Sequence, residues 1–170
     1  MSDIHKLTVS SISQSLVDLG LVPMGVDETI SMMHYFEFFM HGTGHWLGLD
    51  VHDAGSIEEN NKPRKLMPGM VTTIEPGIYI RPNKPEIEFK LLKRDPKKIR
   101  ERRKLLGMEK ATKLENEEMK DAKSIKHIIP KDLLGIGIRI EDDIVCTDDE
   151  PINLTEEAPK TIEDIEAICS

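Results

Sequence analysis

The chain has 170 residues, of which 32% are charged, and its formal net charge is −8. No apolar run reaches the roughly 20 residues that a membrane helix needs, and the first residues lack the apolar core of a signal peptide. Cys146 and Cys169 are too few for a disulfide framework and fit a reducing compartment. We therefore expect a cytoplasmic protein with no general affinity for nucleic acid or membranes.

The first forty residues predict two helices and a strand. Apolar side chains recur at roughly helical spacing over residues 4–19 and stop at Gly20, a residue that often ends helices. Residues 27–33 predict a second short helix, and the aromatic run at residues 35–40 predicts a strand. None of these elements carries a pattern that indicates chemistry, so we expect them to be structural.

Residues 41–53 form a strand-like, glycine-punctuated stretch that holds three of the six histidines, at His41, His45 and His52. Side chains alternate between the two faces of a strand, so His41 and His45 share a face if the backbone stays extended. The glycines permit other geometries, and alternation does not settle the site. A single histidine often caps a turn or satisfies a buried polar group. Three of them beside glycines favour a shared site.

Residues 71–80 read as a β-rich run with a single acidic residue, Glu75, followed by the Pro76-Gly77 turn signal. A lone glutamate in a strand is more often exposed to solvent than catalytic. Glu75 becomes a candidate only together with the histidines.

The composition changes abruptly at residues 83–127, which hold fifteen basic and nine acidic side chains. We expect this charged insert to form one or two exposed helices or to be disordered, since a surface loop tolerates expansion. Its basic surplus raises nucleic-acid binding as an alternative. The many acids and the lone aromatic residue, Phe89, favour a solvated insert instead.

Residues 135–145 alternate again, with isoleucines on one face and Arg139 and Glu141 on the other. A charged pair on one strand face indicates a polar pocket or a wet surface. Asp142 and Asp143 follow as a candidate solvated strand end. Residues 155–168 then predict a C-terminal helix or tail.

The candidate site residues are therefore histidines and two glutamates from three separate segments. One imidazole with two carboxylates suits a hard or borderline divalent ion such as Mn²⁺, Zn²⁺ or Co²⁺. The spacing alone leaves open whether these side chains meet.

Three ordered motifs, at residues 41–53, 67–79 and 135–145, closely resemble the Xaa-Pro aminopeptidase (aminopeptidase P) branch of the pita-bread metallopeptidases. Prolidase, methionine aminopeptidase and creatinase belong to the same family. Trp46 and Asp50 favour the aminopeptidase P branch, because methionine aminopeptidases typically carry a smaller residue after the ligand histidine. The resemblance implies an α+β fold: the second half of a pita-bread fold, with a curved antiparallel sheet and flanking helices.

The resemblance also implies a dinuclear site, usually of manganese, whose bridging water attacks the peptide bond before a proline. By position, His45, Glu75 and Glu141 would be metal ligands, and Glu75 would also relay a proton. His52 would stabilise the tetrahedral intermediate and contact substrate, and His41 would line the substrate pocket. Arg139 would hold a metal ligand or the substrate.

The chain departs from the family pattern in its acidic ligands. The family draws two aspartate ligands from strands well upstream of the histidine motif, and here only Asp3, Asp18 and Asp27 precede it, none in a strand motif. We therefore expect the C-terminal half of the catalytic domain, with a core at residues 1–82 and 128–170 around the insert at 83–127. One weakly held metal ion, or none, is then expected instead of two.

The expected function is metal-dependent release of the N-terminal residue from peptides with proline at the second position, weak or absent in this chain by itself. A separate chain that supplies the missing half is a candidate partner. Two alternatives remain: an inactive fragment or binding module, and a prolidase that cleaves only Xaa-Pro dipeptides.

Overall fold

A computed structural model describes residues 2–60 and 62–170 and combines short helices with small antiparallel sheets. The helices are α1 (Ser2–Asp18), α2 (Val26–Ser31), η1 (His34–Glu37), α3 (Pro96–Leu106), α4 (Met108–Lys120), η2 (Lys131–Leu133) and α5 (Ile162–Cys169). The strands are β1 (Glu58–Glu59), β2 (Lys62–Pro63), β3 (Val71–Ile74), β4 (Gly77–Tyr79), β5 (Glu86–Lys90), β6 (Ser124–Ile128), β7 (Gly137–Arg139), β8 (Asp142–Val145) and β9 (Ile152–Asn153).

The described residues divide into two units. Unit 1 contains those up to Thr8 together with His41–Ile78 and Ile138–Ser170, and unit 2 contains Val9–Met40 and Tyr79–Gly137. None of the helices in this described part of the chain is long and apolar enough to span a membrane.

Helix α1 stops where the sequence predicts, at a glycine in the left-handed region. Gly20 has a φ of +65°. Its N–H donates to the carbonyl of Val17 (3.0 Å), and the N–H of Leu21 donates to the carbonyl of Leu16 (2.9 Å). These two bonds cap the end of the helix, and the buried Leu16 and Leu21 are the apolar pair that usually accompanies such a cap.

Residues 35–40, predicted as a strand, form instead helix η1 and the turn after it. Tyr35, Phe38 and Phe39 are all buried. Their i, i+3, i+4 spacing lies on one side of a helical turn, whereas a strand would send Phe38 and Phe39 to opposite faces. The strand prediction is wrong because burial of this aromatic cluster outweighs strand propensity. The short helix predicted at residues 27–33 is confirmed by α2.

Unit 2 has an apolar core. Its buried apolar residues come from α1, η1, β5, α4 and the loops between them: Val9, Ile12, Leu16, Leu21, Val22, Tyr35, Phe38, Phe39, Ile80, Ile87, Phe89, Ala111 and Ile129. Burial of such side chains is the main stabilising contribution to a unit of this kind.

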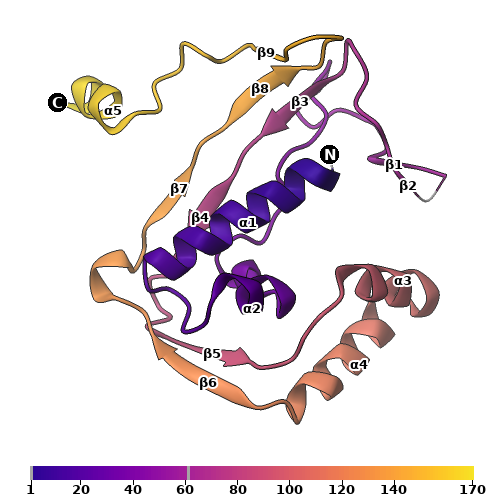
Figure 1. Ribbon diagram of the computed structural model, residues 1–170, viewed down its shortest axis with the longest axis vertical. Helices are drawn as coiled ribbons and strands as arrows, with labels where there is room; N and C mark the ends of the chain where they lie inside the picture. Colours follow the sequence, from indigo (N-terminus) through magenta and orange to yellow (C-terminus); the bar gives the residue numbers. More distant parts are fainter. Residues whose placement is uncertain (1, 61) are drawn as a thin grey trace. The chain divides into compact units, whose positions relative to one another are not determined.

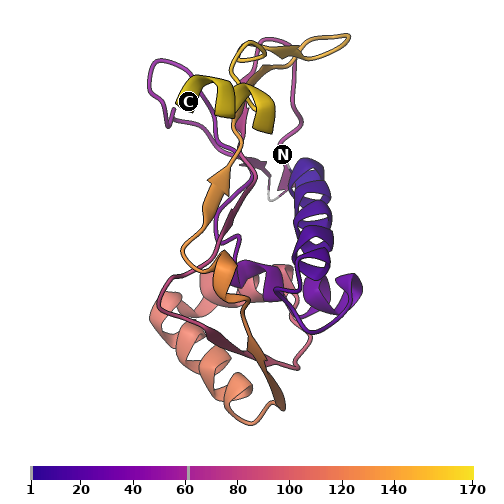
Figure 2. The ribbon, with the colours of Figure 1, turned by 90° about the vertical axis from the view of Figure 1, so that its left-hand side faces the viewer.

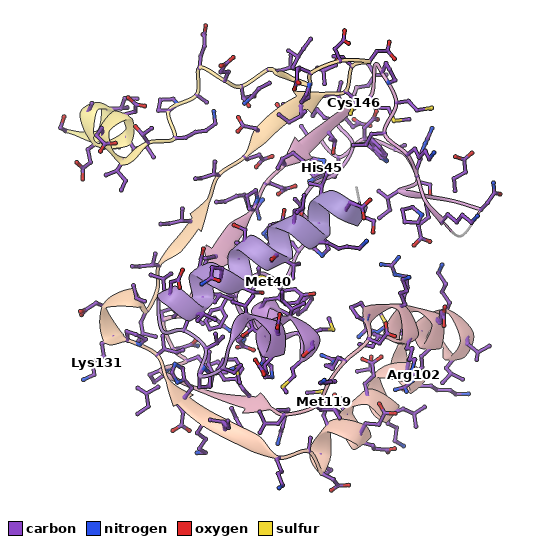
Figure 3. All side chains as sticks on the ribbon, in the orientation of Figure 1. Met40, His45, Arg102, Met119, Lys131 and Cys146 are labelled. Carbon is purple, nitrogen blue, oxygen red and sulfur yellow. The ribbon has the colours of Figure 1, made fainter. Side chains whose placement is uncertain are left out.

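The charged segment at residues 83–127 contains paired strands β5 and β6 and, between them, helices α3 and α4, which pack side by side (Figures 1 and 2). Arg102, labelled in Figure 3, donates two hydrogen bonds to Glu118 (2.8 and 2.9 Å). Arg103 donates to the buried Glu115 (2.9 and 3.3 Å). Part of the charge that the sequence concentrates here is therefore neutralised between the two helices.

Unit 1 is built on the three-stranded sheet β3-β8-β9. Strands β3 and β8 run antiparallel and side by side (Figure 1), with Ile74 opposite Asp142. Residues 43–47 lie along the other edge of β3, joined to it by a β-bridge between Trp46 and Thr72. Strand β3 is thus a central strand between two segments that are distant in sequence.

The buried side chains of unit 1 are mostly polar. Thr43, Thr72, Thr73 and Glu75 are buried there, and Trp46 is the sole apolar side chain of similar burial among the described residues of this unit. Buried polar groups need hydrogen-bond partners. The strand register in unit 1 therefore decides whether these groups are satisfied.

Burial of a histidine in unit 2 should make the protein sensitive to acid. His34 is 7% exposed, and its Nε2 donates to the carbonyl of Lys90 (2.8 Å). Burial is the main cause that lowers the pKa of His34. The hydrogen bond to Lys90 opposes this shift, and nearby Arg94 adds to it, so the pKa lies below its usual value. The unfolded chain therefore binds a proton more readily than the folded chain, so stability should fall as pH drops below about 6.5.

We expect the free energy of unfolding, measured in urea between pH 7.5 and pH 5, to fall less steeply for His34→Gln than for the wild type. Equal slopes for the two proteins would contradict this assignment.

Candidate metal centre

Glu75 lies directly after β3, where Pro76, which lacks an N–H, ends the strand. The residue is only 6% exposed. Thr73 Oγ1 donates to its Oε1 (3.1 Å), and Arg139 Nη1 donates to its Oε2 (2.7 Å). A buried carboxylate requires such partners, and the guanidinium provides the stronger of the two bonds. The position of this carboxylate is therefore fixed.

His45 is held by its backbone and by one ring nitrogen. Its N–H donates to Thr73 Oγ1 (3.0 Å), and its carbonyl accepts from the hydroxyl of Thr72 (2.9 Å). Its Nδ1 lies 3.0 Å from the carbonyl oxygen of Trp46. A carbonyl can only accept, so Nδ1 carries the hydrogen and the neutral ring leaves a lone pair on Nε2.

That lone pair faces a carboxylate. Nε2 of His45 lies 3.4 Å from Oε1 of Glu75. Two acceptors at this distance repel each other unless a proton or a cation lies between them. The pair therefore fits a divalent cation that takes nitrogen from histidine and oxygen from a carboxylate.

Glu141 supplies a third donor beside the pair. The N–H of Ile140 donates to the carbonyl of Pro76 (3.1 Å) and so holds Glu141 next to Glu75. One ligand atom from each of His45, Glu75 and Glu141 lies within 4.8 Å of the other two. Ligand atoms on one ion at about 2.0–2.2 Å lie at most about 4.4 Å apart. A small shift of the exposed Glu141 would bring all three onto one cation.

The other two histidines of the motif adjoin this group. The rings of His45 and His52 meet edge-on, with centroids 4.2 Å apart and planes at 78°. His41 Nδ1 lies 2.7 Å from the carbonyl oxygen of Gly42, and its Nε2 lies 3.4 Å from Arg139 Nη2. Since Nδ1 must donate to the carbonyl, Nε2 is able to accept from Arg139.

The structure thus gathers every site residue predicted from sequence within unit 1, around the position labelled His45 in Figure 3. The strand-like reading of residues 41–53 holds only in part. Residues 43–47 follow β3, but the chain then turns back, and the N–H of Asp53 donates to the carbonyl of Trp46 (3.0 Å). This turn places His52 against His45, which strand alternation could not reveal.

Three threonines and a histidine of the site were missed. Thr72 and Thr73 read as ordinary strand formers, although their hydroxyls bind the His45 backbone and the Glu75 carboxylate. The carbonyl oxygen of Thr43 accepts a hydrogen bond from the N–H of Glu75 (2.7 Å). The hydroxyl of Thr43 lies 2.8 Å from Nδ1 of His5. Thr73 lies two residues before the acid, a spacing that could have singled it out. Nothing in the sequence connects His5 with Thr43.

Asp142 is not the solvated strand end that the sequence suggested. Its carboxylate accepts hydrogen bonds from Thr155 and Lys160. Burial by itself would raise the pKa of Asp142, but these hydrogen bonds outweigh it, so the pKa lies below its usual value.

Residues 1–148 match the family model of metallopeptidase family M24. The chain belongs to this family. The M24 chain is 39% identical to the Xaa-Pro aminopeptidase of Escherichia coli (strain K12) over 153 residues, which cover 90% of this chain and 25% of that protein.

Solved structures of aminopeptidase P are among those similar to the M24 chain. Aminopeptidase PepP of Pseudomonas aeruginosa has a TM-score of 0.68 and 36% identity, with coverage of 96% of this chain and 28% of that one. Zinc-substituted aminopeptidase P of E. coli, in complex with product, has a TM-score of 0.65 and 37% identity, with coverage of 97% and 28%. The M24 chain thus spans about a quarter of the length of these relatives.

The expected α+β fold of the pita-bread kind is confirmed by these neighbours. The expected resemblance to Xaa-Pro aminopeptidase is confirmed as well. The assignment of each site residue to a role remains a prediction.

The close approach of residues 43–47 to β3 should make Gly44 intolerant of a side chain. A methyl group there would overlap the carbonyl oxygen of Thr73, which is strand backbone, whereas one at Gly42 would meet only ordinary contacts. We expect Gly44→Ala to lower the free energy of unfolding by about 1–3 kcal/mol, the usual effect of an overpacked side chain. Urea unfolding of Gly44→Ala and Gly42→Ala measures this, and equal stability of the two variants would contradict it.

Proposed function

We propose that this M24 chain carries part of the metal centre of an aminopeptidase that releases the residue before a proline at the second position of a peptide. The observation that carries the proposal is the convergence of the Nε2 lone pair of His45 with the carboxylates of Glu75 and Glu141. The relatives named as Xaa-Pro aminopeptidases support the choice of substrate.

His45, Glu75 and Glu141 would hold the ion, for which we propose Mn²⁺, with Zn²⁺ or Co²⁺ as substitutes. A bound ion of this kind supplies a water of lowered pKa and polarises the scissile carbonyl. Three side chains are too few for two ions, so we propose one weakly bound ion in this chain alone. Further carboxylates from a separate chain would complete a dinuclear centre.

The roles of the surrounding residues follow from where they lie. Glu75, fixed by Arg139 and Thr73, is proposed to take up and pass on a proton as well as to bind the ion. His52, exposed beside His45, is proposed to donate a hydrogen bond to the oxygen on which charge develops.

His41 is proposed to line the substrate pocket. It contacts Arg139, which already holds Glu75, so a change at either residue would reach the proposed proton carrier. Proline has no N–H and a fixed φ, so the pocket beyond the metal must recognise its ring by shape.

Metal binding tests the centre directly. We expect the purified 170-residue chain to bind about one Mn²⁺ and His45→Ala to weaken binding by on the order of 100-fold or more, since loss of groups that only support a ligand already costs about 10–100-fold. His127→Ala is the matched control, because His127 lies in unit 2 and contacts the carbonyl of Gly20. Equal Mn²⁺ affinity of wild type and His45→Ala, measured by calorimetry, would refute the proposed centre.

Hydrolysis tests the reaction. We expect slow release of the first residue from an Xaa-Pro-Xaa tripeptide in the presence of Mn²⁺, and its loss in Glu75→Gln, which keeps the shape of the side chain and removes its charge. Comparison with an Xaa-Pro dipeptide separates an aminopeptidase from a prolidase. Identical product traces from wild type and Glu75→Gln would favour the alternative of a binding module without catalysis.

A further inference from the structure

We propose that Asp142, Thr155 and Lys160 form a clasp that positions Glu141 for metal binding. The three residues lie in unit 1, on strand β8 and on the segment between β9 and α5. They are positioning residues, since none of them belongs to the proposed ligands. The inference rests on the proposed metal centre.

The ammonium group of Lys160 is the positively charged member of the clasp. Its Nζ donates to the carbonyl oxygens of Thr155 (2.8 Å) and Ala158 (3.1 Å) and lies 3.0 Å from Oδ1 of Asp142. An ammonium group has three hydrogens, and each has an oxygen acceptor here. The side chains of Lys160 and Asp142 are 25% and 22% exposed, so this ion pair is better shielded than a surface pair.

The hydroxyl of Thr155 forms hydrogen bonds to residues of β8 that lie beyond the pairing of β8 with β9. The paired residues of β8 and β9 begin at Ile144 and Asn153. Past that point the hydroxyl of Thr155 accepts the N–H of Asp143 (3.0 Å) and donates to Oδ1 of Asp142 (2.7 Å). The N–H of Leu154 also donates to the carbonyl of Asp143 (2.8 Å). The Thr155 side chain and this backbone bond together fix the first two residues of β8 on the edge away from β3.

This hold separates two adjacent acids, Glu141 and Asp142. Side chains alternate along an extended chain, so fixing the Asp142 carboxylate against Lys160 directs Glu141 to the opposite side, where Glu75 and His45 lie. If the start of β8 rotated, Asp142 could approach the metal in place of Glu141. The clasp opposes this rotation. The positive charge of the Lys160 ammonium also balances the negative charge of the Asp142 carboxylate.

The same contacts exclude a second cation site at the clasp. Carboxylate, hydroxyl and carbonyl oxygens are ligands that hard cations prefer. In this cluster the Lys160 ammonium already occupies the point at which they converge, since it bonds to Asp142, Thr155 and Ala158. The cluster therefore acts on its neighbour Glu141 and not as a metal site of its own.

The test compares Thr155→Val, which keeps the shape of the side chain and removes the hydroxyl, with Thr155→Ser, which keeps the hydroxyl. Lys160→Met removes the ammonium. Lys84→Met is the control, because Lys84 pairs with Glu37 (2.6 Å) in unit 2. Two quantities are measured on the full 170-residue chain: hydrogen exchange of residues 139–143 without metal, and the Kd for Mn²⁺.

We expect Thr155→Val and Lys160→Met to speed exchange at residues 139–143 and to raise the Kd for Mn²⁺ by about 10–100-fold, the usual effect of groups that orient a ligand. Thr155→Ser and Lys84→Met should stay within about threefold of the wild-type Kd, a difference below about 1 kcal/mol.

Unchanged exchange in Thr155→Val would overturn the clasp. Faster exchange with an unchanged Kd would overturn its role in positioning Glu141 and leave a purely structural contact. A wild-type chain that binds no Mn²⁺ would overturn both the proposed function and the positioning role. In that case the exchange data, which need no metal, would still show whether the clasp holds the start of β8.

Discussion

Burial of the Glu75 carboxylate is the constraint on which the rest of unit 1 depends. A carboxylate away from water is tolerated only if charge and hydrogen bonds compensate it. Arg139 from β7 and Thr73 from β3 supply them, and the N–H of Glu75 is taken up by Thr43. Three segments far apart in sequence must therefore meet at this residue, and the meeting brings His45 and Glu141 with it.

The two units satisfy different physical demands. Unit 2 buries aromatic and aliphatic side chains, which require volume but little direction. Unit 1 buries threonines and a glutamate, whose hydrogen bonds require a particular register. A slip of one residue between β3 and β8 would turn Glu141 away from Glu75. The unit that carries the candidate site is thus the one in which register has the greatest consequence.

Selection among similar side chains is a second theme of the site. His45 has two ring nitrogens, and Glu141 and Asp142 are adjacent acids, so contacts with neighbouring groups set which donor is available. The Trp46 carbonyl sets which ring nitrogen of His45 is free. The cluster around Lys160 engages Asp142 and leaves Glu141 open toward the histidine. In both cases we infer that a group with no role in the proposed chemistry determines which donor faces the proposed cation.

The sequence by itself determined features that depend on local physics. Gly20 ends α1 because only glycine adopts a left-handed conformation there without strain, and Pro76 ends β3 because it cannot donate to the sheet. The three motifs identified the family and all six candidate residues. Tertiary structure alone decided the helical turn at residues 35–40, the return of His52 to His45, the support from Thr43 and His5, and the use of Asp142. These features depend on contacts between residues remote in sequence, whose partners no local pattern specifies.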